Sequence, residues 1–486
     1  MTTDQGHHPI CWTIAGSDPG GGAGLQADLK TMHGLGVHAC TVVSALTVQN
    51  TTGVFAVEPV TPELLRAQID RLAEDLPPAA IKLGMLGGAA QVKVVADFLQ
   101  WSDAFVVCDP VLAATSGAAL LDEQGWRLMM DRLLPRADLI TPNFPELGKL
   151  LGRNFQGLEE VPAAAAELLR RGARAVLIKG GHGGGEIAQD YFFDGRQSFW
   201  LTSPRQQVHH THGTGCTLAS AIAAARALGH PLADAIVIAK AYLNQGLRCG
   251  ADIGQGRGSP AHLGWPANAS DLPWLTATSE GGRDRPQFRD CGTQRLGVYP
   301  LVNRAAWLEK LLPLGITTIQ LRAKDLTGAA LEKEIVAAIE LARHFNARLF
   351  INDAWELALK HRAYGVHLGQ EDLPGADLAA LAHGGLRLGI STHNYTELAC
   401  AAAVRPSYIA IGPVFATTTK TLAHPALGAA GFGRLAALAP APVAAIGALT
   451  PERARELPAA NGFAVIGDIL QAADLAARVG QWQQGT

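Results

Sequence analysis

The chain has 486 residues, of which 48% are hydrophobic and only 17% are charged, so disorder of the whole chain is excluded and more than one domain is expected. The 40 Lys and Arg residues are balanced by 43 Asp and Glu residues without any basic block, which argues against a nucleic-acid partner. No uncharged run is long enough to span a bilayer and no charged lead-in to a signal peptide precedes Lys30, so we expect a cytoplasmic protein without membrane contact.

The first half of the chain alternates short apolar runs with amphipathic stretches. Strand-like runs at residues 11–15, 105–108, 139–140 and 175–178 each end in a polar or glycine-rich loop. This pattern predicts an α/β/α sandwich around a mainly parallel sheet, with helices on both faces. In such a fold the ligand lies beyond the carboxyl ends of the strands.

A small-residue segment stands where a helix is expected to begin. Gly213, Thr214, Gly215 and Cys216 precede an alanine-rich helical run at 217–228. Free backbone N–H groups and the helix dipole at such a start predict an anion hole for a transferring phosphoryl group. The alternative is an ordinary helix start, with Cys216 as a small buried residue.

Six motifs carry a family resemblance over residues 9–262. They are AGSDPGGGAG at 15–24, TVQNT at 47–51, KLGML at 82–86, DPV at 109–111, TPNFPE at 141–146 and KGGH at 179–182. Together they resemble the hydroxymethylpyrimidine kinase/hydroxymethylpyrimidine phosphate kinase of thiamine biosynthesis, within the ribokinase-like family.

The resemblance implies roles for individual residues. The pyrimidine would be framed by Asp28, Gln49 and Met85, and the phosphates of Mg-ATP would be served by Asp109, Asn143, Glu146, Lys179 and Thr214. The catalytic residues would be Gly213, Gly215 and Cys216. Because a thiol at a helix N-terminus can have a lowered pKa, we expect Cys216 to accept the proton of the substrate hydroxyl.

Residues 270–290 are polar and rich in Gly, Pro and alternating charge, without a sustained period. They predict a linker at 269–293 between a domain at 9–268 and a second domain at 294–484. The second half contains eight strand-like runs, at 296–302, 316–321, 348–351, 364–368, 386–390, 408–411, 443–446 and 462–466. Helical patterns lie between them, which predicts a compact (β/α)8 barrel with its chemistry at the carboxyl ends of the strands.

Polar residues collect at these strand ends. Gln320, Arg322 and Lys324 alternate with apolar residues, so their side chains share one face and reach the barrel mouth. Asp353 and Asp372 follow adjacent strands and suit one Mg2+ ion, which usually takes one or two carboxylates plus substrate phosphates. A diphosphate could be bound by Arg322, Lys324, Thr417, Thr419 and Lys420.

The motifs QLRAK, FINDAWELAL, GVHLGQEDL, LGIST and GPVFATTTK resemble thiamine phosphate synthase over residues 296 to about 480. The resemblance implies catalytic roles for Arg322 and Lys324 and a metal site at Asp353 and Asp372. Pyrimidine diphosphate would be bound by Gln320, Arg322, Lys324, Asn352, Ser391 and Lys420, and thiazole phosphate by Thr417, Thr419, Gly447 and Gly467. The sequence departs from the family at Ala448 and at Asp468, whose carboxylate would oppose a thiazole phosphate if it faced inward.

The two resemblances support each other because the implied product of the first domain is the implied substrate of the second. We therefore expect a bifunctional enzyme that uses ATP and Mg2+, acts on small molecules and forms a homo-oligomer. One alternative is a pyridoxal-type vitamin kinase fused to a barrel of another activity. A different alternative makes the barrel a non-catalytic binding module.

Overall fold

The computed structural model describes residues 8–112, 120–181, 184–283, 285–293, 295–416 and 425–485. The chain forms two compact units. The first contains Thr2–Pro266 and Asp271–Gly282, and the second contains Ala267–Ser270 and Arg283–Thr486. Within the described residues, no helix combines the length and apolar character needed to cross a membrane.

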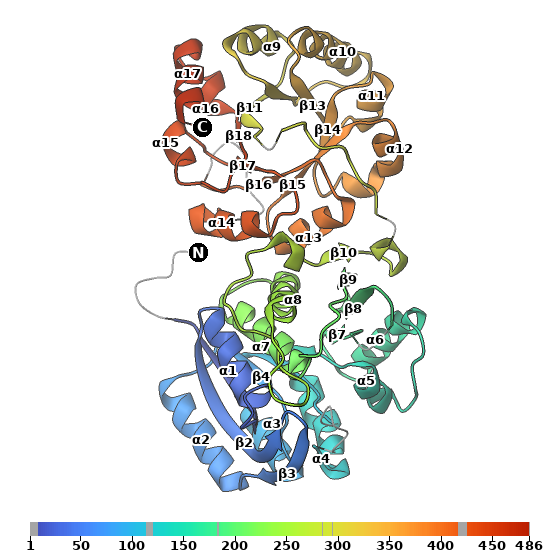
Figure 1. The fold of residues 1–486 in the computed structure, drawn as a ribbon, viewed down its shortest axis with the longest axis vertical. Helices are drawn as coiled ribbons and strands as arrows, with labels where there is room; N and C mark the ends of the chain where they lie inside the picture. Colours follow the sequence, from blue (N-terminus) through green and yellow to red (C-terminus); the bar gives the residue numbers. More distant parts are fainter. Residues whose placement is uncertain are drawn as a thin grey trace. The chain divides into compact units, whose positions relative to one another are not determined.

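The described strands of the first unit form one ten-stranded sheet (Figure 1). Its order is β10-β9-β8-β7-β6-β5-β4-β1-β2-β3. The parallel part consists of β1 (Ile10–Ser17), β2 (His38–Asn50), β4 (Ala80–Leu83), β5 (Phe105–Cys108), β6 (Leu139–Ile140) and β7 (Val176–Ile178). Antiparallel strands extend both edges, namely β3 (Gly53–Pro59), β8 (Ile187–Phe193), β9 (Ser198–Pro204) and β10 (Trp274–Thr276).

Helices cover both faces of this sheet, which confirms the predicted α/β/α sandwich. On one face α1 (Gly24–Gly34), α7 (Thr214–Ala227) and α8 (Leu232–Cys249) pack against one another. The other face carries α2 (Pro62–Asp75), α3 (Ala89–Phe98), α4 (Glu123–Leu128), α5 (Phe144–Leu151) and α6 (Val161–Arg170). Alternation along β1 separates the faces: Trp12 and Ile14 join the α2–α6 core, whereas Thr13 points at α1.

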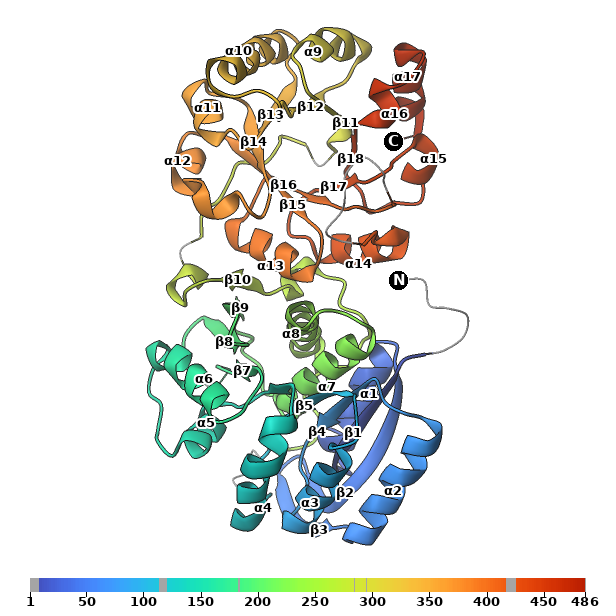
Figure 2. The same ribbon diagram turned by 180° about the vertical axis from the view of Figure 1, so that it is seen from behind.

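The second unit is a closed parallel barrel, as predicted (Figure 2). Its strands are β11 (Gly297–Val302), β12 (Thr318–Leu321), β13 (Arg348–Asn352), β14 (Gly365–Leu368), β15 (Arg387–Thr392), β16 (Tyr408–Ile411), β17 (Val443–Ile446) and β18 (Gly462–Val465), which pairs back to β11. The surrounding helices are α9 (Ala306–Leu311), α10 (Gly328–His344), α11 (Trp355–Lys360), α12 (Leu378–His383), α13 (Tyr395–Val404), α14 (Gly428–Leu438), α15 (Pro451–Ala454), α16 (Gly467–Leu470) and α17 (Leu475–Gly485).

The segment predicted as a linker is partly structured. Strand β10 lies inside it and pairs antiparallel with β9, where Trp274 and Leu275 are buried. The buried carboxylate of Asp271 accepts two hydrogen bonds from Arg248 of α8, each 2.7 Å long. Residues 271–282 therefore belong to the first unit. The sequence pattern missed this because a three-residue edge strand is too short to show a period of two.

Candidate functional site

A cavity of about 500 Å³ opens in the first unit where the parallel strands end. Residues at the ends of five strands line it, namely Ser17 and Asp18 at the end of β1, Lys82 and Met85 in and after β4, Asp109 after β5, Asn143 after β6 and Lys179 after β7. The start of α7 forms another wall. The expectation that the ligand site lies beyond the strands' carboxyl ends is thus consistent with the position of this cavity.

The start of α7, where the anion hole is predicted, lies close to other parts of the cavity wall. Gly213 precedes the helix in the left-handed conformation, with φ of 79°. A Cβ atom on Gly213 would lie 1.9 Å from the carbonyl oxygen of Gly22, and one on Gly215 would lie 3.2 Å from both Asp109 Oδ2 and Lys179 Nζ. Only glycine therefore lets the first turn of α7 approach the loop and the charged groups so closely.

Asp18 holds the glycine-rich loop against this helix start. Its carboxylate accepts hydrogen bonds from the backbone N–H groups of Gly20, Gly22 and Ala23, at 2.8, 3.1 and 2.8 Å. Its Oδ2 also lies 3.2 Å from Nε2 of His212, the residue before Gly213. Burial alone would raise the pKa of Asp18, but the hydrogen bonds from His212 and the loop lower it to about 2.

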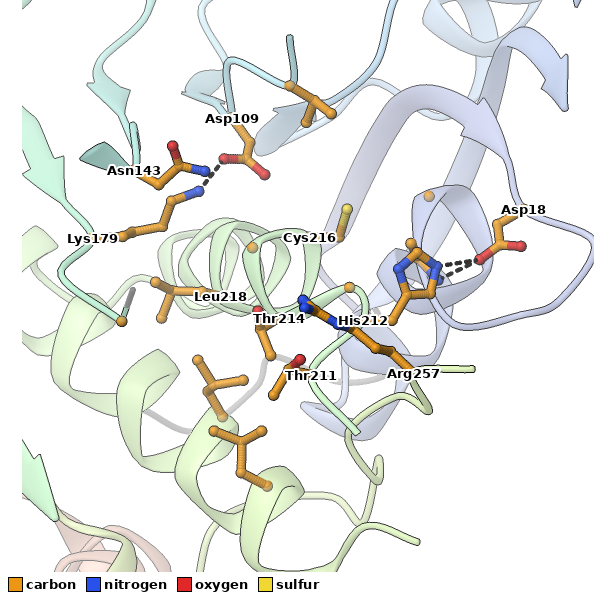
Figure 3. Close-up of a pocket in the computed structure, with 18 of the residues that line it drawn as sticks. Asp18, Asp109, Asn143, Lys179, Thr211, His212, Thr214, Cys216, Leu218 and Arg257 are labelled. Carbon is orange, nitrogen blue, oxygen red and sulfur yellow. Dashed lines mark hydrogen bonds and ion pairs between the residues drawn. The ribbon is translucent and has the colours of Figure 1, made fainter. Parts of the chain in front are cut away.

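Figure 3 shows Asp109, Asn143 and Lys179 close together on one side of Cys216 and the Asp18–His212 pair on the other. Lys179 Nζ lies 2.7 Å from Asp109 Oδ1 and 3.8 Å from Glu146 Oε2. Asn143 caps α5: its Oδ1 accepts from the Glu146 N–H at 2.9 Å, and its own N–H donates to Glu146 Oε2 at 2.8 Å. The cap uses the Oδ1 and the backbone N–H of Asn143 and does not use its amide Nδ2.

Two nearly buried carboxylates, Asp109 and Glu146, share the ammonium group of Lys179. Burial raises the pKa of Glu146 to about 7, with Lys179 opposing and Asp109 adding to the rise. A cation would relieve this excess of negative charge. The described residues hold no cluster of three or more His, Cys, Asp or Glu side chains for a metal, so an ion here would complete its shell with phosphate and water. That donor set fits Mg2+.

The predicted pyrimidine residues divide into two groups. Gln49 and Met85 line the cavity, and the Met85 thioether stands where a side chain on Gly16 would be. Asp28 does not line it: its side chain is fully buried, and its oxygens accept from Thr13 at 2.6 Å, Ser220 at 2.6 Å and Lys82 at 2.7 Å. The prediction that Asp28 touches the pyrimidine is therefore wrong. Asp28 instead pairs with the ammonium group of Lys82, a residue beside the cavity whose side chain is also fully buried.

The expected lowered pKa of Cys216 is also wrong. Burial raises the pKa of this thiol to about 11, because the favourable charge of Lys82 is outweighed by burial together with Asp28 and Asp109. The start of α7 still offers its N–H groups, but the two carboxylates beneath it oppose a thiolate. Cys216 is therefore a neutral thiol at pH 7.

In the barrel, the predicted cation and carboxylate residues meet at the ends of β12, β13 and β14. Lys324 Nζ donates to Asp353, whose backbone has a positive φ of 59°. Partial burial and repulsion from Asp353 raise the pKa of Asp372, whose carboxylate also accepts from the Gly369 N–H at 3.1 Å. Two close carboxylates that repel each other fit one Mg2+ ion, as at the first site. Arg322 follows β12 and Asn352 ends β13, so both lie at the same end of the barrel.

Gln320 and Ser391 are joined by a polar chain through the barrel interior. The Gln320 amide nitrogen donates to the Tyr299 hydroxyl at 3.0 Å, and this hydroxyl lies 2.6 Å from that of Tyr408. His367 Nδ1 lies 2.7 Å from the Tyr408 hydroxyl, and His367 Nε2 lies 2.9 Å from Ser391 Oγ. Burial lowers the pKa of His367 to about 4.

The structure clarifies the departures at Ala448 and Asp468. Gly447 has φ of 116°, and a Cβ there would lie 2.7 Å from the Val414 N–H; the next residue, Ala448, also has a positive φ of 45°. The carboxylate of Asp468, beside Gly467 in α16, bonds Arg478 and accepts from Trp482 Nε1 at 2.7 Å. Its charge is therefore paired with α17. Thr417, Thr419 and Lys420 lie outside the described residues.

Sequence reasoning missed several residues that line or support these sites. Lys82, Asp18 and His212 belong to quoted motifs or their edges but received no role. A lysine within an otherwise apolar strand was the available signal for Lys82, because an ammonium group is buried only beside a partner. Tyr299 and Tyr408 gave no such signal, since aromatic residues in strands are ordinary core material. His367 stands at the end of a predicted strand within the motif GVHLGQEDL, but it received no role of its own.

Comparisons with known proteins find matches to each half of the chain. Residues 18–261 match the family model described as phosphomethylpyrimidine kinase, and residues 299–469 match that described as thiamine monophosphate synthase. The hydroxymethylpyrimidine/phosphomethylpyrimidine kinase of Rhizobium meliloti (strain 1021) is 46% identical over 257 residues, which cover 52% of this chain and 97% of that protein. A solved pyridoxal kinase from Staphylococcus aureus, in complex with AMP-PCP and pyridoxal, superposes with a TM-score of 0.51 and 30% identity, covering 56% of this chain and 98% of that chain.

One match spans both units. The probable thiamine biosynthetic bifunctional enzyme, chloroplastic, of Oryza sativa subsp. japonica is 32% identical over 480 residues, covering 94% of this chain and 85% of that protein. This match decides against a barrel of unrelated or non-catalytic function. The chain belongs to the family of bifunctional thiamine-biosynthetic enzymes, in which an ATP-dependent hydroxymethylpyrimidine and phosphomethylpyrimidine kinase is joined to a thiamine phosphate synthase.

Proposed function

We propose that the cavity of the first unit holds the pyrimidine and ATP together, with the start of α7 at the point of phosphoryl transfer. Gln49 and Met85 bind the pyrimidine, because a side-chain amide can bond its polar edge while a thioether packs on its face. The backbone N–H groups of Gly213 to Cys216 stabilise the charge of the transferring group. The observation that supports this proposal most directly is the close approach of the helix start to Asp109 and Lys179. A Cβ atom on Gly215 would lie only 3.2 Å from each of these two side chains.

We assign the ATP phosphates to Lys179, Thr214 and the amide nitrogen of Asn143. Asp109 and Glu146 would hold Mg2+, which supplies neutralisation of phosphate charge when it is bound. Lys82 adds a second fixed ammonium group, anchored from beneath by Asp28 at 2.7 Å. These groups position and neutralise the triphosphate, and positioning and neutralisation supply most of the rate in phosphoryl transfer.

The hydroxymethyl oxygen attacks the γ-phosphorus while the bond to the β,γ-bridging oxygen breaks and ADP leaves. In a loose transition state the hydroxyl keeps its proton until late, so a strong base is unnecessary. The proton then passes to a phosphate oxygen or to solvent. We therefore propose that Cys216 contacts the substrate as a neutral thiol. The second phosphorylation repeats the step on the monophosphate.

In the barrel we assign the pyrimidine diphosphate to Gln320, Arg322, Lys324, Asn352, Ser391 and Lys420. Arg322 and Lys324 stabilise the negative charge that develops on diphosphate as the bond from the pyrimidine methylene breaks. Asp353 and Asp372 would hold Mg2+, which supplies further neutralisation when bound. The thiazole nitrogen then attacks the methylene carbon. Its phosphate is assigned to Thr417, Thr419 and the backbone at Gly447 and Gly467.

The kinase assignment is tested with Lys179→Met in the full chain, supplied with hydroxymethylpyrimidine, ATP and Mg2+. We expect phosphorylation to fall by about 10²-fold or more, as when one fixed stabilising group is removed. Lys149→Met is the matched control, because Lys149 is on the helix α5 and contacts the Trp126 ring. Equal activity of the two variants would overturn the assignment, and a preference of the native enzyme for pyridoxal would overturn the choice of substrate.

The synthase of the same preparations, supplied with ready-made pyrimidine diphosphate and thiazole phosphate, reports whether the chain is folded. Lys324→Met should abolish this activity by orders of magnitude while sparing the kinase. We also propose, from the sequence alone, a cytoplasmic homo-oligomer. Cell fractionation and the molecular mass from light scattering test these two points.

A further inference from the structure

The polar chain in the barrel interior occupies space that branched apolar residues usually fill. Tyr408 is fully buried, Tyr299 is 1% exposed and His367 is 6% exposed. Gly389 makes this possible, because a Cβ atom there would lie 2.2 Å from the Tyr408 ring. Burying three polar groups costs stability unless each finds a partner, and here each does.

Counting protons gives the chain a direction. The Gln320 amide nitrogen can only donate, so the Tyr299 oxygen accepts from it and Tyr299 passes its own proton to Tyr408. Tyr408 in turn donates to His367 Nδ1. The proton of the neutral ring is then on Nε2, which donates to Ser391 Oγ.

The reverse arrangement fails on the same count. A His367 ring with a proton on Nδ1, whether neutral or charged, would donate to Tyr408, so Tyr408 would have to donate to Tyr299. The Tyr299 proton would then point at the amide nitrogen of Gln320, which cannot accept it. A buried hydroxyl would be left unsatisfied, at the cost that such groups carry. With the Gln320 amide oriented as in the structure, its nitrogen towards Tyr299, only one polarity satisfies every member of the chain.

This polarity fixes what the two ends offer a ligand. Because its nitrogen is engaged within the barrel, Gln320 has its amide oxygen left to accept a hydrogen bond. Ser391 Oγ already accepts from His367, so its own proton is left to donate. Within the described part of the chain, no partner is recorded for either of these two groups. One end is thus an acceptor and the other a donor.

We propose that Tyr299, Tyr408 and His367 are positioning residues of the synthase that fix Gln320 as an acceptor and Ser391 as a donor, and so select a 4-aminopyrimidine over its 4-oxo counterpart. The inference rests on the proposed assignment of Gln320 and Ser391 to the pyrimidine diphosphate. An amino group donates while the ring nitrogens and phosphate oxygens accept, which matches the pair. A 4-oxo ring presents an acceptor and an N–H in their place.

The test is Tyr408→Phe in the full chain. Without the Tyr408 hydroxyl, the Tyr299 proton has no acceptor until the Gln320 amide turns over and presents its oxygen to Tyr299. The mouth then offers the amide nitrogen, a donor, where it had offered an acceptor. Tyr364→Phe is the matched control, since it deletes a hydroxyl of the same barrel that donates to the Cys291 carbonyl, outside the chain.

We expect KM for the pyrimidine diphosphate to rise about ten-fold in Tyr408→Phe with kcat within about two-fold, the signature of lost binding that is equal in ground and transition states. The 4-oxo pyrimidine diphosphate should inhibit this variant more strongly relative to that KM. The ratio of its inhibition constant to the KM of the 4-amino substrate should therefore fall about ten-fold or more. Inorganic diphosphate, which has no ring, should inhibit all variants equally. Tyr364→Phe should match the native enzyme.

The outcomes separate this inference from the proposed function. If Gln320→Ala and Ser391→Ala leave KM for the pyrimidine diphosphate unchanged, the ligand assignment itself fails. If those variants lose binding but Tyr408→Phe discriminates between amino and oxo rings as Tyr364→Phe does, the positioning role alone is refuted. Tyr299→Phe provides a second break in the chain should Tyr408→Phe fold poorly, and it should also narrow the discrimination. Kinase activity of the same preparations checks recovery of the first unit.

Discussion

The protonation state of Cys216 can be tested by the pH dependence of the kinase. With a pKa of about 11, only about one thiol in 10⁴ is ionised at pH 7. If the thiolate were the general base, kcat/KM would rise about ten-fold per pH unit, or about 300-fold between pH 7 and 9.5. If the neutral thiol is the active form, the profile should lack this slope and show only the rise of about two-fold near pH 7 that ionisation of Glu146 produces. Because the pKa of Cys216 is raised to about 11, the protonated thiol dominates over this whole range, and a thiolate base could only make the rate rise with pH.

The assay measures ADP release from Mg-ATP and hydroxymethylpyrimidine for the native enzyme and for Cys216→Ser. A serine hydroxyl does not ionise in this range, so the variant lacks any thiolate yet keeps a small hydroxyl of similar shape. We expect both proteins to give profiles of the same shape, without a unit slope above pH 7.5, and the variant to stay within about ten-fold of the native rate, the scale of one lost contact. A unit slope in the native enzyme that disappears in Cys216→Ser would refute the neutral-thiol reasoning.

Three further predictions follow from single contacts. Gly213→Ala should lower kinase kcat by about 10²-fold, because the new Cβ would lie 1.9 Å from the carbonyl oxygen of Gly22. Gly36→Ala is the control: Gly36 has φ of 85° and no atom within 4 Å of a Cβ, so this variant should carry only backbone strain and keep its kinase activity. Arg478→Ala should raise the synthase KM for thiazole phosphate about five-fold by releasing the Asp468 carboxylate, and adding Asp468→Asn should restore it; an unchanged KM would show that this charge does not reach the phosphate. Burial lowers the pKa of His262 to about 4, so between pH 7 and 5 the unfolded chain binds a proton that the folded chain does not. The free energy of unfolding of the first unit should therefore fall by about 1 to 2 kcal/mol over this range. Urea inactivation of the kinase should show this loss, and His262→Gln should remove it.

Strand positions could be predicted well from the sequence. The predicted runs at 408–411 and 443–446 coincide with β16 and β17, because each is a short apolar run bounded by turn residues. The same logic predicted that polar residues after the strands lie together, since parallel strands all end at one edge of a sheet, and the structure has such residues around one cavity. Strand β10 was not predicted by this reasoning, because Trp274 and Leu275 are only two apolar residues in an otherwise polar segment.

Side-chain partners inside the fold were harder to predict. A motif indicates that Asp28 matters, but only the structure shows that its carboxylate is occupied by Thr13, Lys82 and Ser220. Likewise, the helix start around Cys216 suggests a thiolate, whereas Asp28 and Asp109 beneath it decide the opposite. Spacing along the chain records which residues share an element, and pKa values depend on charges from other elements.

The two proposed sites have a similar arrangement of charges. In each, two carboxylates that would hold a cation share the site with an ammonium group, Lys179 beside Asp109 and Lys324 beside Asp353. Such a lysine favours the ionised form of the carboxylates, although burial and mutual repulsion still raise the pKa of Glu146 to about 7 and raise the pKa of Asp372. The charge of the lysine then lies next to the incoming phosphate. The lysine therefore does more than add attraction: without it, the paired carboxylates would repel the phosphate oxygens that must approach them. Exchanging Lys179 or Lys324 for a neutral residue should consequently weaken phosphate binding more than loss of one ion contact alone would predict.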